Sequence, residues 1–572
     1  MVRVSNLTVG FLLTLSATLS AALQANVTEE LPSIDLDGAS AFGLPSDDIT
    51  DLVAEAEENL GIKSPRFKRR GILRPRLNRG CGSKTTACQG LYNYLHRYKD
   101  PKKVAAVFAW EGTSNYNDWN DGSFWSATTY LKPDCVYRPT TSEDISVAIQ
   151  ITVLAKGKFN VVGGGHSAIK GWANADGGVL LSLANFDKVN VNKGGYVEVG
   201  AGCRWRDVYS KLDTVGLMCA GGRMAGVGVP GLTLGGGISY LTNEYGFVAD
   251  NVKNFEIVLG NGAITNANIN QNPALFKALK GGSSNFGVVT RIDLYTVASS
   301  GVYAGQLYFP QSDFSKLQRA MFNYHSTGAT QDPQSHMIAA FVYVGAYQMH
   351  LGAFTAYRSV AKADPGPALK ELLAVNPGVT SSGTLQVRKY GTMAQELGGS
   401  DMAGLRQDMR DLTILVDSTI YNEFWLVFND RLVKPFSNVP GFQATLAFHP
   451  ITPKAVQAGK NRGGNSLGLD NITKPILVVN LTTQWASPAD DKRIRAALED
   501  IHANYILHAK NRKLYHEYIY LNYARQSDNP LASYGTAAAK ALQCASQKYD
   551  PNGVFQKQVP GGFKVNFSST RC

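Results

Sequence analysis

The sequence lacks several features that would assign the protein to a class at once. Beyond residue 25 it has no run of about 20 unbroken apolar residues, so nothing there predicts a membrane-spanning helix. Its seven cysteines include no Cys-x-x-Cys pair, and no Cys/His cluster has the spacing of a zinc site. Low-complexity segments are absent as well. We therefore expect a globular protein with no metal site and no membrane association.

Two neighbouring segments each lack charge of one sign. Residues 26–60 contain ten acids and no Lys or Arg, whereas residues 61–80 contain eight Lys/Arg and no acid. A basic run can indicate nucleic-acid binding, but here no aromatic stacking pattern or nucleic-acid motif accompanies it. We expect a solvated or processed leader and no nucleic-acid partner. Lys68-Arg69-Arg70 resembles a dibasic processing site, and both cleavage near Arg70 and an uncut surface arm stay open.

The first 25 residues have the pattern of a secretory signal peptide. Arg3 precedes an apolar stretch near 9–19, and the small residues 20–22 follow it. We therefore predict that the protein is secreted or resides in the secretory pathway. Four permissive glycosylation sequons lie beyond this segment, at Asn26, Asn471, Asn480 and Asn566.

Cysteine usage fits an oxidising compartment, where a structural disulfide is more common than a redox centre. Two pairings stay open: Cys88 with Cys135 is the first choice, and Cys81 with Cys88 the second. Because the count of seven is odd, at least one thiol remains free.

Hydrophobic periodicity and turn signals divide the 572 residues into two parts, and each part has its own pattern of helices and strands. Up to about residue 300, short strands alternate with helices. The predicted helices there are 49–60, 86–98, 143–156, 204–215 and 274–280, and the strands are 159–162, 179–183, 196–199, 252–260, 263–265 and 288–290. Farther on, we predict strands at 303–309, 337–358, 413–429, 474–485 and 518–523, with helices at 312–326, 365–375, 490–506 and 535–549.

Glycines cluster in three places, and the first cluster presents a histidine. Residues 163–167 read Gly-Gly-Gly-His-Ser, and further glycines gather in 226–237 and 281–287. Glycine lets the backbone approach a ligand closely, and free N–H groups in such loops hold phosphates. We expect the three loops to wrap a phosphate-bearing cofactor, with His166 beside its reactive end.

Residues 226–231 also match Gly-x-Gly-x-x-Gly, the fingerprint of a Rossmann nucleotide site. That fingerprint must end a strand and open a helix. The preceding residues do not look like a strand, and 232–237 are poor helix formers, so we reject a Rossmann site.

The block from Pro133 to Thr296 resembles the cofactor domain of the vanillyl-alcohol oxidase and p-cresol methylhydroxylase flavoproteins. It is most similar to their berberine bridge enzyme branch, in its fungal secreted form. The resemblance covers roughly residues 85–560, and its motifs come in the family's order: Arg138-Pro139, Gly164-Gly165-His166-Ser167, Gly200-Ala201-Gly202, Gly226-Val227-Gly228-Val229, Leu234-Gly235-Gly236-Gly237, Asp250-Asn251-Val252, Gly287-Val288-Val289-Thr290, Tyr520-x-Asn522-Tyr523 and 529–534.

This resemblance implies an α+β fold with a two-part FAD-binding domain of the p-cresol methylhydroxylase type and an α+β substrate-binding domain. The C-terminal segment would return to complete the FAD site. The expected boundaries are a signal peptide at 1–25, a leader at 26–80, the FAD-binding domain at 81–302, the substrate-binding domain at 303–515 and the C-terminal segment at 516–572.

The resemblance also implies that His166 is bonded covalently to FAD. Many relatives add a second bond from a cysteine, but Met224 stands at that position here, which predicts a single link. Cys219 is expected to be a packed apolar residue, and Pro230 replaces a glycine usual in the family. The residues expected to bind the cofactor are Gly163, Gly164, Gly165, His166, Ser167, Gly226, Gly228, Val229, Gly231, Thr233, Gly236, Gly287, Val289 and Asn522.

The implied function is a secreted, monomeric FAD-dependent oxidase. A small organic substrate, such as an alcohol, an amine or a secondary-metabolite intermediate, would give a hydride to the flavin, and oxygen would become hydrogen peroxide. Tyr520 and Tyr523 are the candidates for the base, while Glu423 and His449 are more consistent with solvated or structural roles. Two alternatives remain: an oligosaccharide oxidase that forms a lactone, and a non-catalytic flavin-binding scaffold. The sequence leaves the substrate and the choice between oxidase and dehydrogenase open.

Overall fold

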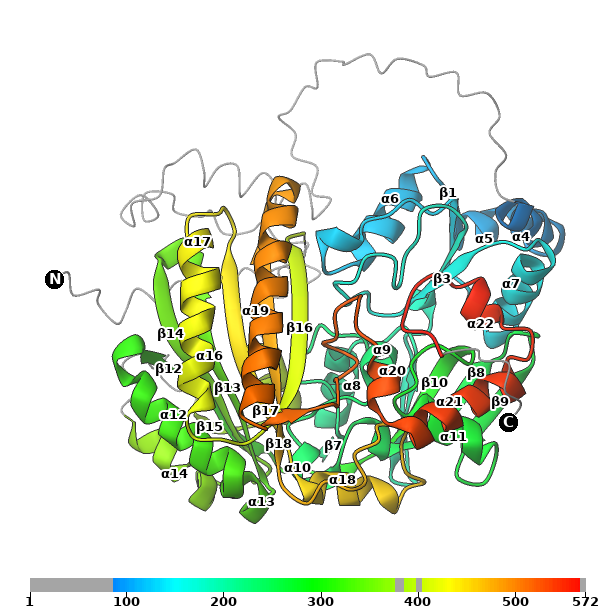
Figure 1. Ribbon diagram of the computed structural model, residues 1–572. Helices are drawn as coiled ribbons and strands as arrows, with labels where there is room; N and C mark the ends of the chain where they lie inside the picture. Colours follow the sequence, from blue (N-terminus) through cyan, green and yellow to red (C-terminus); the bar gives the residue numbers. More distant parts are fainter. Residues whose placement is uncertain (1–85, 376–384, 398–403, 566–572) are drawn as a thin grey trace, which may run out of the picture. The chain divides into compact units, whose positions relative to one another are not determined.

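The computed structural model describes residues 86–375, 385–397 and 404–565. These residues form a mixed α+β structure (Figure 1), and its sheets have four, five, two and eight strands, which confirms the predicted fold class. The signal segment, the charged leader, the helix at 49–60 and the basic site near Arg70 lie outside the described residues. Within the described part, no helix is long and apolar enough to cross a bilayer.

The four-stranded sheet carries the first glycine loop. Its order is β1 (Phe108–Trp110), β2 (Cys135–Tyr137), β4 (Val179–Ser182) and β3 (Phe159–Val162), and β2, β4 and β3 run parallel. Helix α7 (Ser142–Leu154) connects β2 to β3, and the Thr141 hydroxyl caps its start by accepting the Asp144 N–H. The loop 163–167 follows β3 directly, so its position is fixed by a buried parallel strand.

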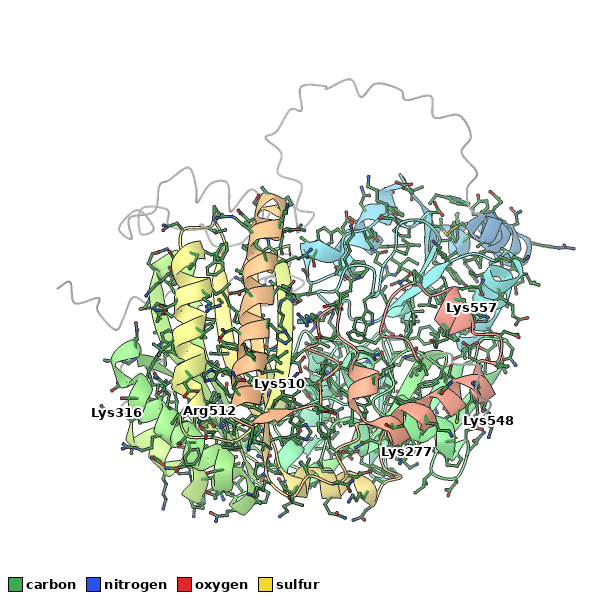
Figure 2. All side chains as sticks on the ribbon, viewed as in Figure 1. Lys277, Lys316, Lys510, Arg512, Lys548 and Lys557 are labelled. Atoms are coloured by element: carbon green, nitrogen blue, oxygen red, sulfur yellow. A yellow bond between two sulfur atoms is a disulfide. The ribbon has the colours of Figure 1, made fainter. Side chains whose placement is uncertain are left out.

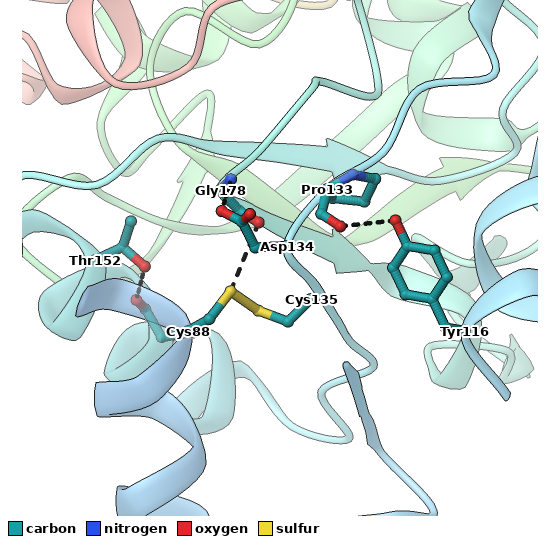
Figure 3. Close-up of a disulfide and its surroundings, with 8 residues drawn as sticks. Cys88, Tyr116, Pro133, Asp134, Cys135, Thr152 and Gly178 are labelled. Carbon is teal, nitrogen blue, oxygen red and sulfur yellow. Dashed lines mark hydrogen bonds between the residues drawn. A yellow bond between two sulfur atoms is a disulfide. The ribbon is translucent and has the colours of Figure 1, made fainter. Parts of the chain in front are cut away.

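A disulfide joins Cys88 in α4 (Thr86–Tyr98) to Cys135 in β2, as Figure 3 shows. Both cysteines are fully buried. The first of the two pairings considered from the sequence is therefore confirmed. Cys203 and Cys219 are free and buried, and Cys219 packs within the hydrophobic core as expected.

The five-stranded sheet is antiparallel throughout. Its order is β5 (Val189–Asn192), β6 (Tyr196–Gly200), β10 (Val288–Tyr295), β8 (Val252–Val258) and β9 (Ile264–Asn268). An Asn261-Gly262 turn joins β8 to β9, and Gly262 takes the positive φ of +83° that such a turn needs. A separate two-stranded sheet pairs β7 (Leu217–Met218) with β11 (Val297–Ala298).

Short helices surround these first sheets. They are α5 (Pro101–Ala105), α6 (Ser114–Asn120), α8 (Trp205–Asp213), α9 (Val229–Leu234), α10 (Thr242–Tyr245) and α11 (Pro273–Leu279). Helices α8 and α11 confirm the predictions at 204–215 and 274–280 within the usual end uncertainty.

The eight-stranded antiparallel sheet forms the second half of the described chain. Its order is β15 (Gln386–Arg388), β12 (Val302–Pro310), β14 (Met349–Arg358), β13 (Ser335–Val344), β17 (Gln443–Ile451), β18 (Ile476–Trp485), β16 (Arg406–Leu415) and β19 (Tyr515–His516). Seven helices accompany it: α12 (Phe314–Asn323), α13 (Ala329–Gln331), α14 (Gly366–Ala374), α15 (Tyr390–Leu397), α16 (Ile420–Phe428), α17 (Lys434–Phe436) and α18 (Pro453–Lys460). The long α19 (Asp491–Asn511) confirms the helix predicted at 490–506.

Alternate residues of the central strands face different surroundings. On β17, Leu446 and Phe448 pack into a core shared with α12, α14, α16 and α19. Thr445, Ala447 and His449 point to the opposite face, where they line a cavity. Because side chains alternate along a strand, one short sequence builds both a helix-covered core and a cavity wall. Figure 1 shows α16 and α19 lying across the covered face.

The C-terminal segment packs against the first half of the chain. It contains α20 (Pro530–Ser533), α21 (Thr536–Tyr549) and α22 (Val554–Lys557). Val554, Phe555 and Val559 enter the same core as the disulfide, and the Phe159 N–H at the start of β3 donates to the Gln558 carbonyl at 3.0 Å. The end of the chain therefore supports the strand that presents the first glycine loop.

The strand predicted at 413–429 is wrong after residue 415. Strand β16 ends there, and the rest of the segment contains α16. The buried residues Ile420, Tyr421, Phe424, Trp425 and Phe428 follow helical spacing, although each type also favours strands. The Asp417 carboxylate accepts the Thr419 N–H at 2.9 Å, which turns the chain before the helix.

The strand predicted at 518–523 is also wrong. These residues form an irregular turn, because side chains occupy the backbone donors that a strand would use. The Tyr520 N–H donates to the Asp411 carboxylate at 2.8 Å, and the Ile519 N–H donates to the Ser533 hydroxyl at 3.0 Å. Aromatic content alone therefore gave a misleading signal in this segment.

Candidate functional site

One large cavity brings the three glycine loops together. Its volume is about 930 Å³, and strands of the eight-stranded sheet and the C-terminal segment complete its wall. This volume lies near the upper end of the range of roughly 300–1,000 Å³ for small-molecule and cofactor sites. The predicted site residues on its wall are Gly163, Gly164, Gly165, His166, Ser167, Gly228, Gly231, Gly287, Val289, Tyr520, Asn522 and Tyr523.

Four predicted cofactor residues do not line the cavity: Gly226, Val229, Thr233 and Gly236. Val229 and Thr233 are fully buried, and the Thr233 hydroxyl donates to the Val229 carbonyl at 2.7 Å inside α9. The Gly226 carbonyl accepts from the Arg204 guanidinium, and a Cβ at Gly236 would face Leu467. These four residues lie outside the cavity wall and support the conformation of the second loop.

The first and second glycine loops pack directly against each other. A Cβ atom on Gly164 would overlap the backbone of Gly228, and a Cβ on Gly228 would overlap Gly164. Gly165 has a φ of +63°, and a Cβ there would overlap the Ser123 carbonyl. Side chains are therefore excluded by contact at all three positions, and the loop conformation that presents His166 depends on glycine.

His166 lies at the cavity wall under an aromatic ring. The indole of Trp125 stacks on the imidazole with ring centroids 4.2 Å apart and planes at 10°. The backbone N–H of Trp125 donates to the Gly165 carbonyl at 3.0 Å, which links the tryptophan to the glycine loop. The ring plane of His166 is therefore set by a neighbour that is itself bonded to the same loop.

The second loop opens a short helix, contrary to the sequence argument. Residues 229–234 form α9, although 232–237 had been expected to be poor helix material. The residues directly before the motif, 219–225, are not a strand, because β7 ends at Met218, so the rejection of a Rossmann site still rests on that part of the argument. Met224 and Pro230 both line the cavity, and Gly231 has no atom within 4 Å of the position of a Cβ.

The third loop supplies two serines and the start of β10. Ser283, Ser284, Gly287 and Val288 all line the cavity. Ser283 has a positive φ of +57°, and its N–H donates to the Leu234 carbonyl at 3.1 Å. This hydrogen bond connects the third loop to α9, the helix that the second loop opens.

Tyr520 and Asn522 hold the C-terminal turn against the second loop. The Tyr520 hydroxyl oxygen accepts from the Ile238 N–H at 2.9 Å and from the Asn522 amide at 3.0 Å. Asn522 also donates to the Leu232 carbonyl at 3.0 Å. Burial raises the pKa of Tyr520 above its ordinary value. These contacts favour a structural role for the Tyr520 hydroxyl over that of a base.

Arg223 forms a polar cluster with His449 and Tyr523. Its guanidinium lies 3.0 Å from His449 Nδ1 and donates to the Tyr523 hydroxyl oxygen at 2.7 Å. All three residues line the cavity. Arg223 is 7% exposed and His449 is 3% exposed. From the sequence, a structural or solvated role is expected for His449, but the alternation of side chains along β17 places it in the cavity wall.

Charged residues gather at the β16 edge of the cavity. Arg410 bridges Asp408 and Glu499 at 3.2 and 2.6 Å. Arg495 lies 3.5 Å from Asp408, and Arg525 pairs with Glu499. Because Glu499 is 56% exposed, this ion cluster marks a solvent-facing rim.

Glu423 lies away from the cavity. It is on α16 and pairs with His508 and Arg512 at the end of α19, where Figure 2 labels Arg512 among the cations of the outer helices. The expectation that Glu423 is structural agrees with these contacts. The sequon at Asn480 is buried on β18 and lines the cavity, so the folded protein cannot present it to a glycosyltransferase.

The residues present fit FAD. Three loops expose backbone without side chains, most openly at Gly231, where a cofactor can approach closely. Apolar side chains suited to a flat ring system line the same cavity: Val161, Leu183, Val288 and Phe555. No group of three or more His, Cys, Asp or Glu suited to a metal occurs among the described residues.

Sequence reasoning missed Arg223 and Trp125. Arg223 is the only charged residue in the stretch 214–243, which a scan for isolated charges in apolar and glycine-rich sequence would have found. Trp125 comes from a segment 41 positions before His166, and no local pattern indicates that the two rings meet.

The chain is similar to known FAD-binding proteins. Residues 133–268 match the family model of the FAD binding domain. The chain is 32% identical to the FAD-dependent monooxygenase tpcD of Cochliobolus heterostrophus over 454 residues, which cover 77% of this chain and 87% of that protein. It is also 32% identical to the bifunctional solanapyrone synthase of Alternaria solani over 441 residues, 77% of this chain and 83% of that protein.

Among solved structures, the fold is similar to that of the wild-type BBE-like 1 protein of Physcomitrella patens. The TM-score is 0.65 at 18% sequence identity, and the match covers 85% of this chain and 100% of the other. At this identity the likeness concerns the fold alone.

Proposed function

The chain belongs to the berberine bridge enzyme-like branch of the vanillyl-alcohol oxidase and p-cresol methylhydroxylase flavoproteins, and from this membership we propose that it is a secreted oxidase of a small organic molecule. It is an FAD-dependent oxidoreductase, and two of its relatives are named as an FAD-dependent monooxygenase and a bifunctional solanapyrone synthase. The observation that carries the proposal is the single cavity in which the His166 loop meets the polar Arg223, His449 and Tyr523 cluster.

The chemistry divides between cofactor and protein. Bound FAD would supply the two-electron step, taking a hydride from the substrate and reducing oxygen to hydrogen peroxide. The protein binds and orients the substrate between the glycine loops and the face of β17 and β18. Tyr523 is the proposed base for the substrate hydroxyl or amine proton, because its oxygen lies in the cavity wall and accepts from Arg223.

We assign the covalent attachment of FAD to His166 alone. His166 stands on the cavity wall after three glycines, and Met224 on the same wall has a thioether that lacks the thiol needed for a second link. Denatured wild-type protein should keep yellow flavin through gel electrophoresis in SDS. The H166A variant should release all of it, and M224A should retain it. Covalent flavin in H166A would contradict the assignment.

A peroxide assay separates the proposed activity from its alternatives. We expect hydrogen peroxide from a member of a panel of phenolic, polyketide and amine substrates, and none from oligosaccharides. Turnover of oligosaccharides instead would identify a lactone-forming sugar oxidase. No turnover, together with a flavin that dithionite does not reduce, would identify a non-catalytic flavin-binding scaffold.

The proposed secretion rests on the signal-like first 25 residues and on the buried disulfide, which suits an oxidising compartment. Expression in a fungal host should place the protein in the medium, and sequencing of its N-terminus would show whether the chain is cut near Arg70. A product that keeps residue 1 and stays inside the cell would contradict secretion. Sedimentation of the secreted form should give the mass of a monomer.

A further inference from the structure

Arg223 places a positive charge deep in the cavity. Its side chain is 7% exposed and lies on the cavity wall between Gly222 and Met224. A buried charge is unfavourable unless a counter-charge or strong hydrogen bonds compensate it. The charges of the groups around Arg223 therefore indicate whether its guanidinium is neutralised within the protein or is left to bind a ligand.

Arg223 has two hydrogen-bond partners, a histidine and a tyrosine, and neither is a carboxylate. Burial, with a smaller contribution from the Arg223 charge, lowers the pKa of His449 well below its ordinary value, so this imidazole is uncharged at neutral pH. Since a guanidinium only donates, His449 Nδ1 must be the acceptor of their 3.0 Å contact. Tyr523 accepts through its hydroxyl oxygen at 2.7 Å. Among the described residues, no carboxylate lies within 4.0 Å of the Arg223 guanidinium.

Other titratable groups near Arg223 are neutral as well. Burial raises the pKa of Tyr240 to about 12, although the Arg223 charge opposes the shift. The pKa of His336 is lowered by burial first and by the Arg223 charge second. Tyr520 also stays protonated, because burial raises its pKa. None of these neighbours supplies a negative charge.

The acidic residues that line the cavity form ion pairs with other arginines and not with Arg223. Asp408 and Glu499 are its two carboxylates, and both pair with arginines at the β16 rim. Five cationic side chains line the cavity against these two acids: Lys170, Arg223, Arg410, Arg495 and Arg525. The excess is positive, and Arg223 contributes to it from a buried position on the cavity wall.

We propose that Arg223 is the anion-binding residue of the substrate pocket and that the substrate enters as an organic oxyanion, a carboxylate or an ionised enol or phenol. The inference rests on the proposed oxidase and specifies its substrate class. An oxyanion bound to the guanidinium lies beside the Tyr523 hydroxyl, because the same guanidinium donates to both. Arg223 thereby places the substrate next to the proposed base. His449, which lies on β17, keeps the guanidinium in position by accepting a hydrogen bond from it.

Calorimetric titration of the flavin-loaded protein with benzoate and benzamide tests the proposal. The two probes have nearly the same shape and differ in charge. We expect wild type to bind benzoate at least about tenfold more tightly than benzamide, because a hydrogen bond between two charged groups is stronger than one to a neutral amide. R223Q and R223M should lose this preference, while R223K should keep part of it.

R495Q is the matched control. Arg495 also lines the cavity, but it is 39% exposed and paired with Asp408, so its removal should leave the benzoate preference within about threefold of wild type. Equal affinity of wild type for both probes overturns the proposal, and so does a preference that survives in R223Q or R223M. If neither neutral variant folds, the wild-type ratio alone decides.

The outcome is independent of turnover. Benzoate selectivity that depends on Arg223 in a protein that oxidises no substrate would support the anion site and contradict the oxidase. Peroxide production without such selectivity would support the oxidase and reject the anion site.

Discussion

Two neighbouring tyrosines in the C-terminal turn differ in the hydrogen-bond partners of their hydroxyl oxygens. Tyr520 accepts from the Ile238 N–H and the Asn522 amide and is 2% exposed. Tyr523 is half-buried and accepts from the Arg223 guanidinium on the cavity wall. The sequence could not separate the two as base candidates, because the motif contains both and the difference lies in their partners.

Replacing Tyr523 with Phe should slow the reaction without unfolding the protein. Removing a general base lowers kcat by about 10²- to 10⁴-fold, and the phenyl ring still fills the site. The measurement is the rate of flavin reduction, with whichever panel substrate reduces wild type fastest. Y520F is the matched variant: its lost acceptor leaves two donors unpaired, so it should lower stability by roughly 1–3 kcal/mol and affect the rate less. A larger rate loss in Y520F than in Y523F would reverse the assignment.

Trp125 should influence how readily flavin becomes attached. Its stacking on His166 holds the imidazole plane, and an aromatic pair of this kind contributes about 0.5–1.5 kcal/mol. W125A should therefore form covalent flavin about two- to tenfold more slowly, whereas W125F keeps a ring and should stay near wild type. The readout is fluorescence of the denatured protein band at timed intervals after FAD is added to apoprotein. Equal rates in W125A and wild type would show that the stacking has no part in attachment.

At the scale of elements, the sequence predicted structures whose local pattern agrees with their surroundings. The helix 86–98 and the strand 159–162 occur with the predicted bounds, because apolar periodicity and burial coincide there. The segment 413–429 and the run 518–523 failed for different reasons. In the first, side chains with strand preference repeat at helical spacing. In the second, Asp411 and Ser533, distant in sequence, take up the backbone donors.

The disulfide between α4 and β2 should stabilise the first half of the described chain. Its cysteines are 47 residues apart, and closing a loop of that size lowers the stability of the unfolded chain relative to the folded one by about 4 kcal/mol in the chain-entropy model. The double variant C88S/C135S should show a clearly lower Tm, measured by calorimetry. Reductant should lower the Tm of wild type more than that of the double variant, in which Cys544 is still disulfide-bonded. C219A, at a free buried thiol, is the control and should lose only about 1 kcal/mol. A double variant as stable as wild type would show that the link is dispensable.

At the scale of the whole molecule, the described halves share one cavity, and this arrangement was predicted only through the family resemblance. Spacing along the chain indicates three glycine loops, but it does not indicate that β17 and β18 face them. Arg223 and His449 are 226 positions apart, and they meet only because the eight-stranded sheet forms the opposite wall. Contacts of this range depend on how sheets pack, which no local pattern records.

Buried histidines should make the stability of the molecule sensitive to acid. Burial lowers the pKa of His325 from 6.5 to about 3, and its Nδ1 lies 2.9 Å from the Tyr421 hydroxyl. Between these two pH values the unfolded chain binds a proton that the folded chain does not, so stability falls as pH decreases below 6.5. The expected contribution from this residue is about 2 kcal/mol between pH 6.5 and pH 5.

Comparison with H325Q isolates this contribution, which is needed because burial raises the pKa of Asp550 to about 6 and acts in the opposite direction. Urea denaturation at pH 7 and pH 5 should show a smaller loss of stability in H325Q than in wild type. H96Q, at an exposed position, serves as the control. Parallel losses in wild type and H325Q would contradict the prediction.

The alternation along β17 and β18 has a consequence for how such proteins diversify. Leu446, Phe448, Val479 and Leu481 belong to the helix-covered core, while Thr445, Ala447, Thr482 and Gln484 belong to the cavity. Replacing the second set changes the shape and polarity offered to a ligand while the first set keeps the sheet folded. A library restricted to those four positions should therefore retain a high fraction of folded members, and selection on it can explore new substrates without first having to restore stability.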